Sequence, residues 1–410
     1  MERAGIRRCD VPTQHRLQTL AVSAFLVMLI AGVATGQAPP GQPKGDGLLR
    51  SELSLGGRTA TLAYAPGLKA NDAAHKGLLS ATTGSTPARV RVGQLDTTGS
   101  LRIGTIDLAG PQQAQTPAGA QTPGQGPAAV HYDLWLEAAN NGWQLQVTGT
   151  DKVVAGRIPL PRQAAAPTSP NLVTALIPED STVGRLVLRW GDYQATADVQ
   201  FSDPSRRRTD ENRGVNVTTN RRHDDDTSVL SRARLLAQRN ETALVLPKGP
   251  RISVSFQRTF ARADRTAGNS NTSRGLGVDG PDFAHLMQTP DGEIVMLTES
   301  SVPRLRTEVP LQFGKALIDT GNQVPGFPGS YGVWLKRVGS GWRLVFNNEP
   351  DAWGSQHDPK FDAAEVALSH SEGHAAARPF AVAIEPRAAD RGRLVIVWGA
   401  HEWTADFVAG

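Results

Sequence analysis

Short runs in which apolar and polar residues alternate recur along the chain, separated by turns rich in Gly and Asn. In Arg89–Val92 two valines alternate with two arginines, so an extended segment has one apolar face and one charged face. Asn140-Asn141-Gly142 joins two alternating runs, Tyr132–Glu137 and Trp143–Thr148, and such turns supply the positive φ of tight hairpins. Strands at roughly ten-residue spacing, without strand–helix alternation, predict an all-β sandwich or barrel.

The alternating pattern contains one cassette that occurs twice, with the same residue types at the same spacing. A match in both residue type and gap length indicates an internal duplication. We therefore expect two tandem sandwich-like β domains, in which the paired tyrosines and tryptophans fill equivalent interior positions. The matched positions are Tyr132 with Tyr331, Trp143 with Trp342, and Trp190-Gly191 with Trp398-Gly399.

The length of 410 residues is sufficient for two or three domains with separate cores. Between the repeats lies a segment rich in Arg and acidic residues that has almost no large apolar side chain, which is typical of a solvated linker. The predicted organisation is a signal peptide at 1–36, a flexible leader at 37–47, a first β domain at 48–202 with a disordered insert at 109–130, a charged linker at 203–241, and a second β domain at 242–410.

The N-terminus has the pattern of a secretion signal. Arginines precede the apolar run Leu20–Ile30, and Ala34-Thr35-Gly36 offers small residues for cleavage. We therefore expect an exported protein, periplasmic or extracellular, with no stable membrane span after signal cleavage. The one cysteine, Cys9, lies in the segment that would be removed, so the fold has no disulfide. A formal net charge of +4 gives no reason to expect a nucleic-acid partner.

The second repeat resembles a bacterial exported family known as domain of unknown function 2911. The resemblance lies in Ser330–Val333, in Trp342–Asn348, in Trp353-Gly354 and in Leu394–Trp398, and it extends over most of residues 242–408. The first repeat is a weaker relative, because it lacks the paired asparagines and the equivalent of Trp353-Gly354. The resemblance implies export and a β fold, and it implies no activity.

His370, Glu372 and His374 form the sharpest arrangement with metal-ligand character. On an extended strand these alternate positions point to the same side, so they could converge on zinc. The alternative is an exposed polar loop, because Gly373 lies within the segment and β-branched residues are missing from it. No cofactor is predicted elsewhere.

Four other residues are candidates for ligand contact. Trp353, His357 and Asp358 lie in a stretch of the second repeat that has no counterpart in the first, and Trp403 also lacks a partner there. An exposed indole suits stacking against sugar rings. His357 beside Asp358 could be an oriented imidazole for acid–base chemistry, or it could make a hydrogen bond at the rim of the sandwich.

The preferred function from the sequence is a non-catalytic binding or interaction module of the cell envelope or exterior, with a carbohydrate or another protein as ligand. The alternative is a metal-dependent or acid–base hydrolase whose site lies in the second repeat. In that alternative His357, His370, Glu372 and His374 would carry the chemistry.

Overall fold

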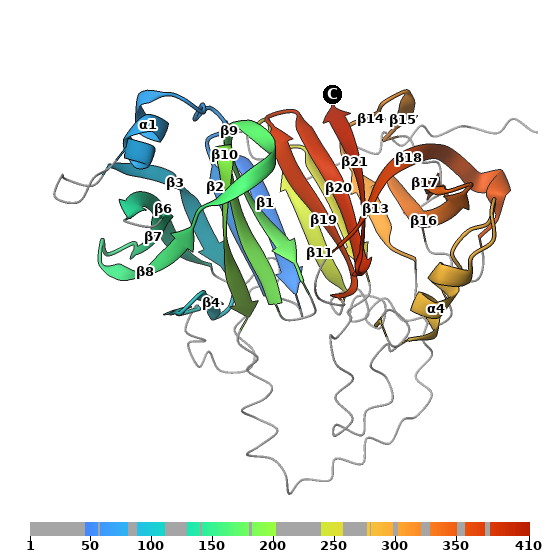
Figure 1. The fold of residues 1–410 in the computed structure, drawn as a ribbon, viewed down its shortest axis with the longest axis horizontal. Coiled ribbons are helices and arrows are strands. Elements are labelled where there is room, and N and C mark those ends of the chain that lie inside the picture. Colours follow the sequence, from blue (N-terminus) through green and yellow to red (C-terminus); the bar gives the residue numbers. More distant parts are fainter. Residues whose placement is uncertain are drawn as a thin grey trace, which may run out of the picture. The chain divides into compact units, whose positions relative to one another are not determined.

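In the computed structural model, the described residues of the unit Pro43–Gly410 form mostly β-strands, with two short helices (Figure 1). This confirms the all-β prediction. The described residues are 46–55, 58–80, 88–110, 129–139, 142–179, 183–201, 239–256, 277–278, 280–297, 302–320, 329–350, 357–373 and 378–410.

Residues 49–201, here called half one, form ten strand segments and one short helix. The elements in chain order are β1 (Leu49–Leu55), β2 (Arg58–Tyr64), α1 (Ala73–Ser80), β3 (Arg89–Thr97), β4 (Leu101–Ile103), β5 (Ile106–Leu108), β6 (Val130–Ala139), β7 (Gly142–Gly149), β8 (Val154–Pro161), β9 (Gln163–Pro178) and β10 (Val183–Phe201).

Residues 240–409, here called half two, repeat this order of elements. They are β11 (Asn240–Val245), β12 (Arg251–Phe256), α4 (Pro281–Gln288), β13 (Arg304–Thr307), β14 (Leu311–Phe313), β15 (Ala316–Ile318), β16 (Ser330–Val338), β17 (Gly341–Asn347), the 3-10 turn η1 (Pro359–Phe361), β18 (Asp362–Glu372), β19 (Arg378–Ala388), β20 (Arg391–Gly399) and β21 (His401–Ala409).

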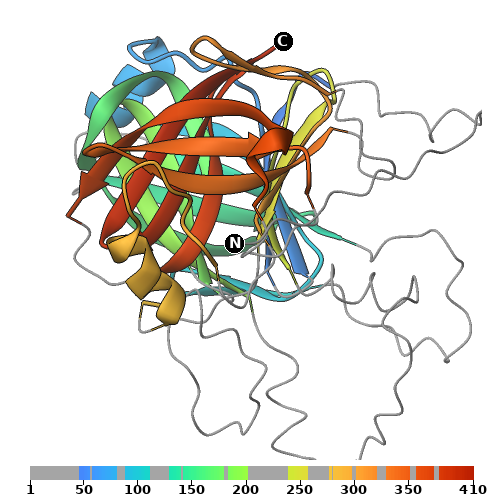
Figure 2. The same cartoon turned by 90° about the vertical axis from the view of Figure 1, so that its right-hand side faces the viewer.

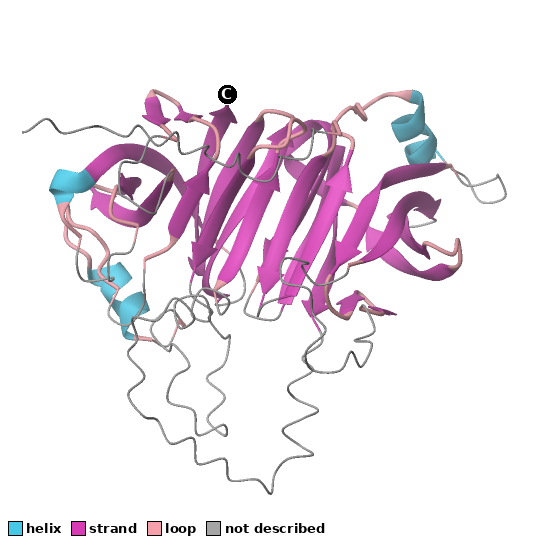
Figure 3. Cartoon of the chain, turned by 180° about the vertical axis from the view of Figure 1, so that it is seen from behind, coloured by secondary structure: helices cyan, strands magenta, loops and turns pink. Residues whose placement is uncertain are grey.

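One sheet of 17 strands continues from half one into half two (Figure 3). Its antiparallel pairings give the order β8-β7-β6-β3-β2-β1-β11-β12-β13-β16-β17-β18-β21-β20-β19, with β14 and β15 attached to the end of β21. A second sheet has the order β5-β4-β10-β9. Contacts place β9 over β1 and β2, and β19 over β11 and β12, so each half has two layers.

β10 folds back on itself as a hairpin. The side chains of Arg185 and Asp198 form an ion pair at 4.0 Å. Thirteen residues of extended strand would separate them by about 40 Å, so the chain folds back on itself. Gly191 makes the bend with φ of +62°, and Gly399 bends the equivalent β20–β21 connection with φ of +63°.

Equivalent residues in the two halves make equivalent contacts. The Tyr132 hydroxyl donates to the carbonyl of Ala109, and the Tyr331 hydroxyl donates to the carbonyl of Asp319. On the helices, His75 packs against Trp190 with ring centroids 4.9 Å apart, and Phe283 of α4 packs against Trp398 at 5.7 Å. Helix α4 is drawn in gold beside the strands of half two in Figure 2. An internal duplication would produce this correspondence.

The two halves meet where β1 pairs with β11, side by side at the centre of Figure 1. In this register Glu52 lies opposite Ala243. These two positions are equivalent in the two halves. The pair Leu49–Tyr64 between β1 and β2 corresponds to the pair Asn240–Phe256 between β11 and β12, and Glu52 and Ala243 each lie three residues after the first member of their pair. The junction is therefore symmetric about that residue pair. Leu49 and Tyr64 of half one also pack in the core of half two.

The aromatic side chains of the cassette lie inside, as predicted. Trp143, Trp190, Trp342 and Trp398 are at most 5% exposed, and both cassette tyrosines are also buried. The ring of an interior Trp removes a large apolar area from water, which stabilises the sheet packing without disulfides.

The sequence did not predict the helices α1 and α4. Within the described residues, 293–297 contribute a single bridge, Ile294 with Lys336, and 304–313 form the two short strands β13 and β14. The signal peptide, most of the insert at 109–130 and residues 203–238 of the linker lie outside the described residues. In the part of the chain that the structure describes, no helix is both long and apolar enough to cross a membrane.

Candidate functional site

Trp403 does not form a contact surface. Its side chain is fully buried on β21, with its ring stacked on that of His370 at a centroid distance of 5.2 Å. The residue faces the interior because β21 alternates buried and more exposed positions along its length. The prediction of an exposed Trp403 was therefore wrong. Trp353, the other proposed indole, lies outside the described residues.

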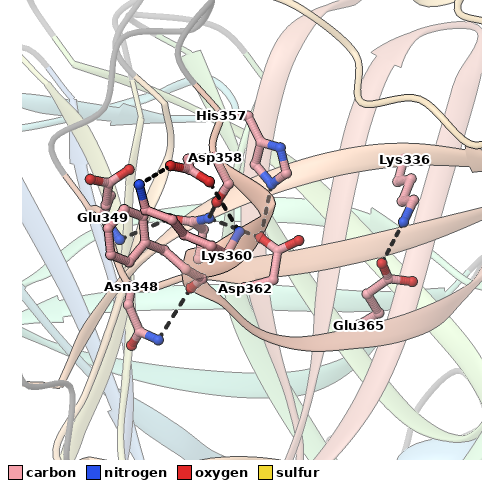
Figure 4. A network of polar contacts seen from close by, with 10 residues as sticks. Lys336, Asn348, Glu349, His357, Asp358, Lys360, Asp362 and Glu365 are labelled. Carbon is pink, nitrogen blue, oxygen red and sulfur yellow. Dashed lines mark hydrogen bonds and ion pairs between the residues drawn. The ribbon is translucent and has the colours of Figure 1, made fainter. Parts of the chain in front are cut away.

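His357 contacts a different carboxylate from the one adjacent in sequence. Its Nε2 lies 2.8 Å from Asp362 Oδ1, at the start of β18 (Figure 4). The imidazole also packs edge-on against Trp334, with centroids 5.2 Å apart. The Asn347 side-chain amide donates to the same Asp362 oxygen at 2.8 Å. These contacts hold the turn before β18 against β17.

Asp358 has a local structural role. Its carboxylate accepts a hydrogen bond from the backbone N–H of Lys360 at 3.1 Å and forms an ion pair with the Lys360 ammonium at 2.5 Å (Figure 4). The hydrogen bonds and charge of Lys360 lower the pKa of Asp358 below its usual value. Asp358 thereby caps η1.

His370 and Glu372 lie together with a third residue, His401 of β21. His370 Nε2 is 3.2 Å from His401 Nδ1, and His401 Nδ1 is 3.3 Å from Glu372 Oε1. One ligand atom from each residue lies within 4.8 Å of the others. The predicted third ligand, His374, lies outside the described residues.

The sequence did not single out His401, because the contact depends on strand register. Glu372 pairs directly with His401, and His370 pairs with Trp403. The one available signal was the position of His401 two residues after the bend at Gly399, where the hairpin returns toward β18. Without the pairing of β18 with β21, that position could not be connected with His370.

The histidine cluster and the His357 network are two separate sets of contacts among the described residues. His357 contacts Asp362 and Trp334, whereas His370 contacts His401 and aromatic rings of the core. A hydrolase that uses His357 and His370 in one site therefore has no support from these contacts.

Half two also contains an open groove with a volume of about 390 Å³. It lies where the β14–β15 hairpin faces β17, β18 and β21. Glu365 forms ion pairs there with Lys336 at 2.5 Å and with Arg343 at 3.1 Å. The lining residues are Phe313, Gly314, Lys315, Ala316, Arg343, Glu365, Val366, Ala367, Ser369, Thr404, Ala405 and Asp406.

Comparison with known families agrees with the resemblance seen in the second repeat. Residues 307–407 match the model of a family described as protein of unknown function (DUF2911). The match contains the groove, the His357 network and the histidine cluster. No curated protein and no solved structure matches the chain.

Proposed function

We propose that the protein is an exported, non-catalytic binding module whose ligand site is the groove of half two. The groove itself carries the proposal, because it combines a volume of about 390 Å³ with charged, hydroxyl and apolar lining groups. Small-molecule sites typically have volumes of roughly 300–1,000 Å³ and a few placed polar groups. Export rests on the N-terminal pattern of Leu20–Ile30 followed by Ala34-Thr35-Gly36.

The comparison between the halves supports a ligand role for half two. In half one a Cβ added at Gly104, in the β4–β5 turn, would lie 2.9 Å from Ile158 Cγ2. At Gly314, in the equivalent β14–β15 turn, such a Cβ would have nothing within 4 Å. The space under the turn is thus filled in half one and open in half two. We therefore assign a supporting role to half one.

The charges of the groove favour a ligand with an acidic group. Asp406 is paired with Arg393 at 2.5 Å, and Arg343 is paired with Glu365. Lys315 is exposed and has no ion-pair partner among the described residues. Its ammonium is therefore available to a carboxylate. Ser369 and Thr404, which pair across β18 and β21, add hydroxyl groups to the lining. An acidic carbohydrate combines the carboxylate and hydroxyl groups that this lining can bind.

The test is a glycan array that contains neutral and uronic-acid oligosaccharides, followed by titration of any ligand found. A charge-assisted hydrogen bond contributes about 1.5–3 kcal/mol, so Lys315→Ala should weaken binding by about tenfold or more. Lys248→Ala, which changes an exposed lysine outside the groove, should leave the affinity unchanged. If no acidic glycan binds, or if Lys315→Ala binds as well as the wild type, this ligand assignment is wrong. Binding of an acidic peptide alone would indicate a protein ligand.

A further inference from the structure

We infer that His370, Glu372 and His401 bind a transition-metal dication of the zinc type at the rim of half two. His370 and Glu372 are alternate residues of β18 and therefore project from the same face of the strand. His401 is the direct neighbour of Glu372 on β21. Two paired strands thus bring three potential ligands together. The groove residues Ser369 and Thr404 form the next cross-strand pair and project from the opposite face of β18 and β21, so this site is separate from the proposed ligand groove.

The distances between the ligand atoms fit a small coordination sphere. Zinc bonds of about 2.0–2.1 Å in a tetrahedral site place neighbouring ligand atoms about 3.3 Å apart. The separation of His370 Nε2 and His401 Nδ1 is 3.2 Å, and that of His401 Nδ1 and Glu372 Oε1 is 3.3 Å. The remaining pair, His370 and Glu372, lies within 4.8 Å. A small rotation of the exposed Glu372 side chain would complete the set.

Hydrogen bonds among the three side chains cannot satisfy both short contacts at once. His401 Nδ1 lies at the centre of both short contacts and carries at most one proton. If that proton is donated to Glu372, it is not available to His370 Nε2. If His370 Nε2–H instead donates to His401, the lone pair of His401 Nδ1 is occupied and a carboxylate oxygen faces it without a proton. A cation satisfies all three ligand atoms together.

The two imidazoles are held in position by Trp403. Its buried ring is stacked on His370 at 5.2 Å with an interplanar angle of 19°, and on His401 at 5.5 Å with an angle of 29°. The two rings are therefore positioned before any metal arrives.

Half one shows that this part of the fold does not require the cluster. The pair Glu372–His401 corresponds to the pair Ala164–Tyr193, and His370 corresponds to Arg162. Arg162 places its guanidinium carbon 5.3 Å from the centre of the Tyr193 ring. In half one, the Arg162 guanidinium on the Tyr193 ring therefore occupies the place that corresponds to the cluster. Among the described residues, this rim carries a set of potential metal ligands in half two and not in half one.

The ligand types indicate which metals bind. Imidazole nitrogens suit Zn²⁺, Cu²⁺, Ni²⁺ and Co²⁺, whereas Mg²⁺ and Ca²⁺ prefer sites composed of oxygen atoms. His370 and Glu372 are exposed, while His401 is buried. A bound metal would therefore have three protein ligands and one coordination position open to solvent, which is available to water or to a ligand atom.

The experiment uses the full chain without a polyhistidine tag, stripped of metals by a chelator. We expect one Zn²⁺ per chain by calorimetry, and one Co²⁺ with the visible absorption of a tetrahedral site. Loss of a hydrogen-bonding neighbour of a metal ligand costs about 10–100-fold in affinity, so loss of a ligand should cost at least tenfold. This loss is expected for His370→Ala and for the milder Glu372→Gln, which replaces an exposed side chain.

His131→Ala is the matched control, because His131 forms a 2.6 Å pair with Asp96 in half one. It should retain the affinity of the wild type. Zn²⁺ should also raise the thermal midpoint of the wild type and of His131→Ala, because a ligand that binds the folded state stabilises it. It should not raise the midpoint of His370→Ala. Absence of stoichiometric binding by the wild type overturns the inference. So does undiminished binding by folded His370→Ala and Glu372→Gln.

Discussion

Arg189 of half one forms an ion pair with Glu385 of half two, with its Nη1 atom 2.8 Å from Glu385 Oε2. The same carboxylate oxygen lies 3.0 Å from Nη2 of Arg387. All three side chains are at most 19% exposed. One carboxylate therefore compensates two largely buried guanidinium groups at the contact between the halves.

Glu385→Gln should lower the free energy of unfolding by about 1–3 kcal/mol, because it removes the carboxylate that the two largely buried guanidinium groups share. Urea denaturation measures the change. Asp107→Asn, which breaks the fully exposed pair with Arg102, is the control and should have no measurable effect. Equal effects of the two substitutions would contradict the compensation described for Glu385.

The turns at Gly104 and Gly314 allow a second comparison. Both glycines have positive φ, +55° and +56°, so alanine should cost about 1 kcal/mol at either position. At Gly104 the added methyl group would also collide with Ile158. Gly104→Ala should therefore cost about 1–3 kcal/mol more than Gly314→Ala in chemical denaturation. Identical losses would show that the space under the two turns is alike.

Trp403→Ala should be among the most destabilising single substitutions in half two. The indole is fully buried and stacked against two histidines, and removal of a core Trp costs about 3–5 kcal/mol. Denaturation monitored by circular dichroism gives the value. Val408→Ala changes a neighbouring residue of β21 that is 40% exposed, and it should change stability by less than about 0.5 kcal/mol. A small loss for Trp403→Ala would place its ring at the surface.

Glu365 should contribute a pH-dependent part of the stability. The hydrogen bond from Lys336, together with the charges of Lys336 and Arg343, lowers the pKa of Glu365 below its ordinary value of 4.5. A carboxyl whose pKa is lower in the folded state stabilises the fold above its unfolded pKa, and this contribution is lost as the pH falls through the folded pKa. Glu365→Gln should thus reduce stability at pH 7 by less than about 1 kcal/mol. The difference from the wild type should decrease below pH 4.5. A difference that is independent of pH would contradict this assignment.

Local patterns were sufficient for much of the fold. Alternation and turn residues predicted the β6–β7 and β16–β17 hairpins, and cassette spacing identified the buried tryptophans. The helices were missed although both carry start signals. Asp72 accepts a hydrogen bond from the backbone N–H of His75, and Pro281 occupies the first turn of α4. Each helix has only eight residues, too few for helical periodicity to become clear.

The candidate site was only partly predictable, because it depends on contacts between distant strands. His370 and Glu372 could be grouped by their spacing within one strand. His401 could not, since its position follows from the register of β18 with β21. In the same way, Asp358 is adjacent to His357 in sequence, but η1 brings Asp362 to the imidazole instead. Burial of Trp403, in contrast, follows from the alternation along β21.

The pairing of β1 with β11 has a consequence for any attempt to study half two alone. Without β1, the backbone donors and acceptors on one side of β11 would lose their partners and become a free edge, which invites pairing with another chain. Because the junction is centred on equivalent positions, Glu52 and Ala243, that edge is close to self-complementary. An isolated half two should therefore assemble as a dimer through two copies of β11, in which a second molecule takes the place of the missing half.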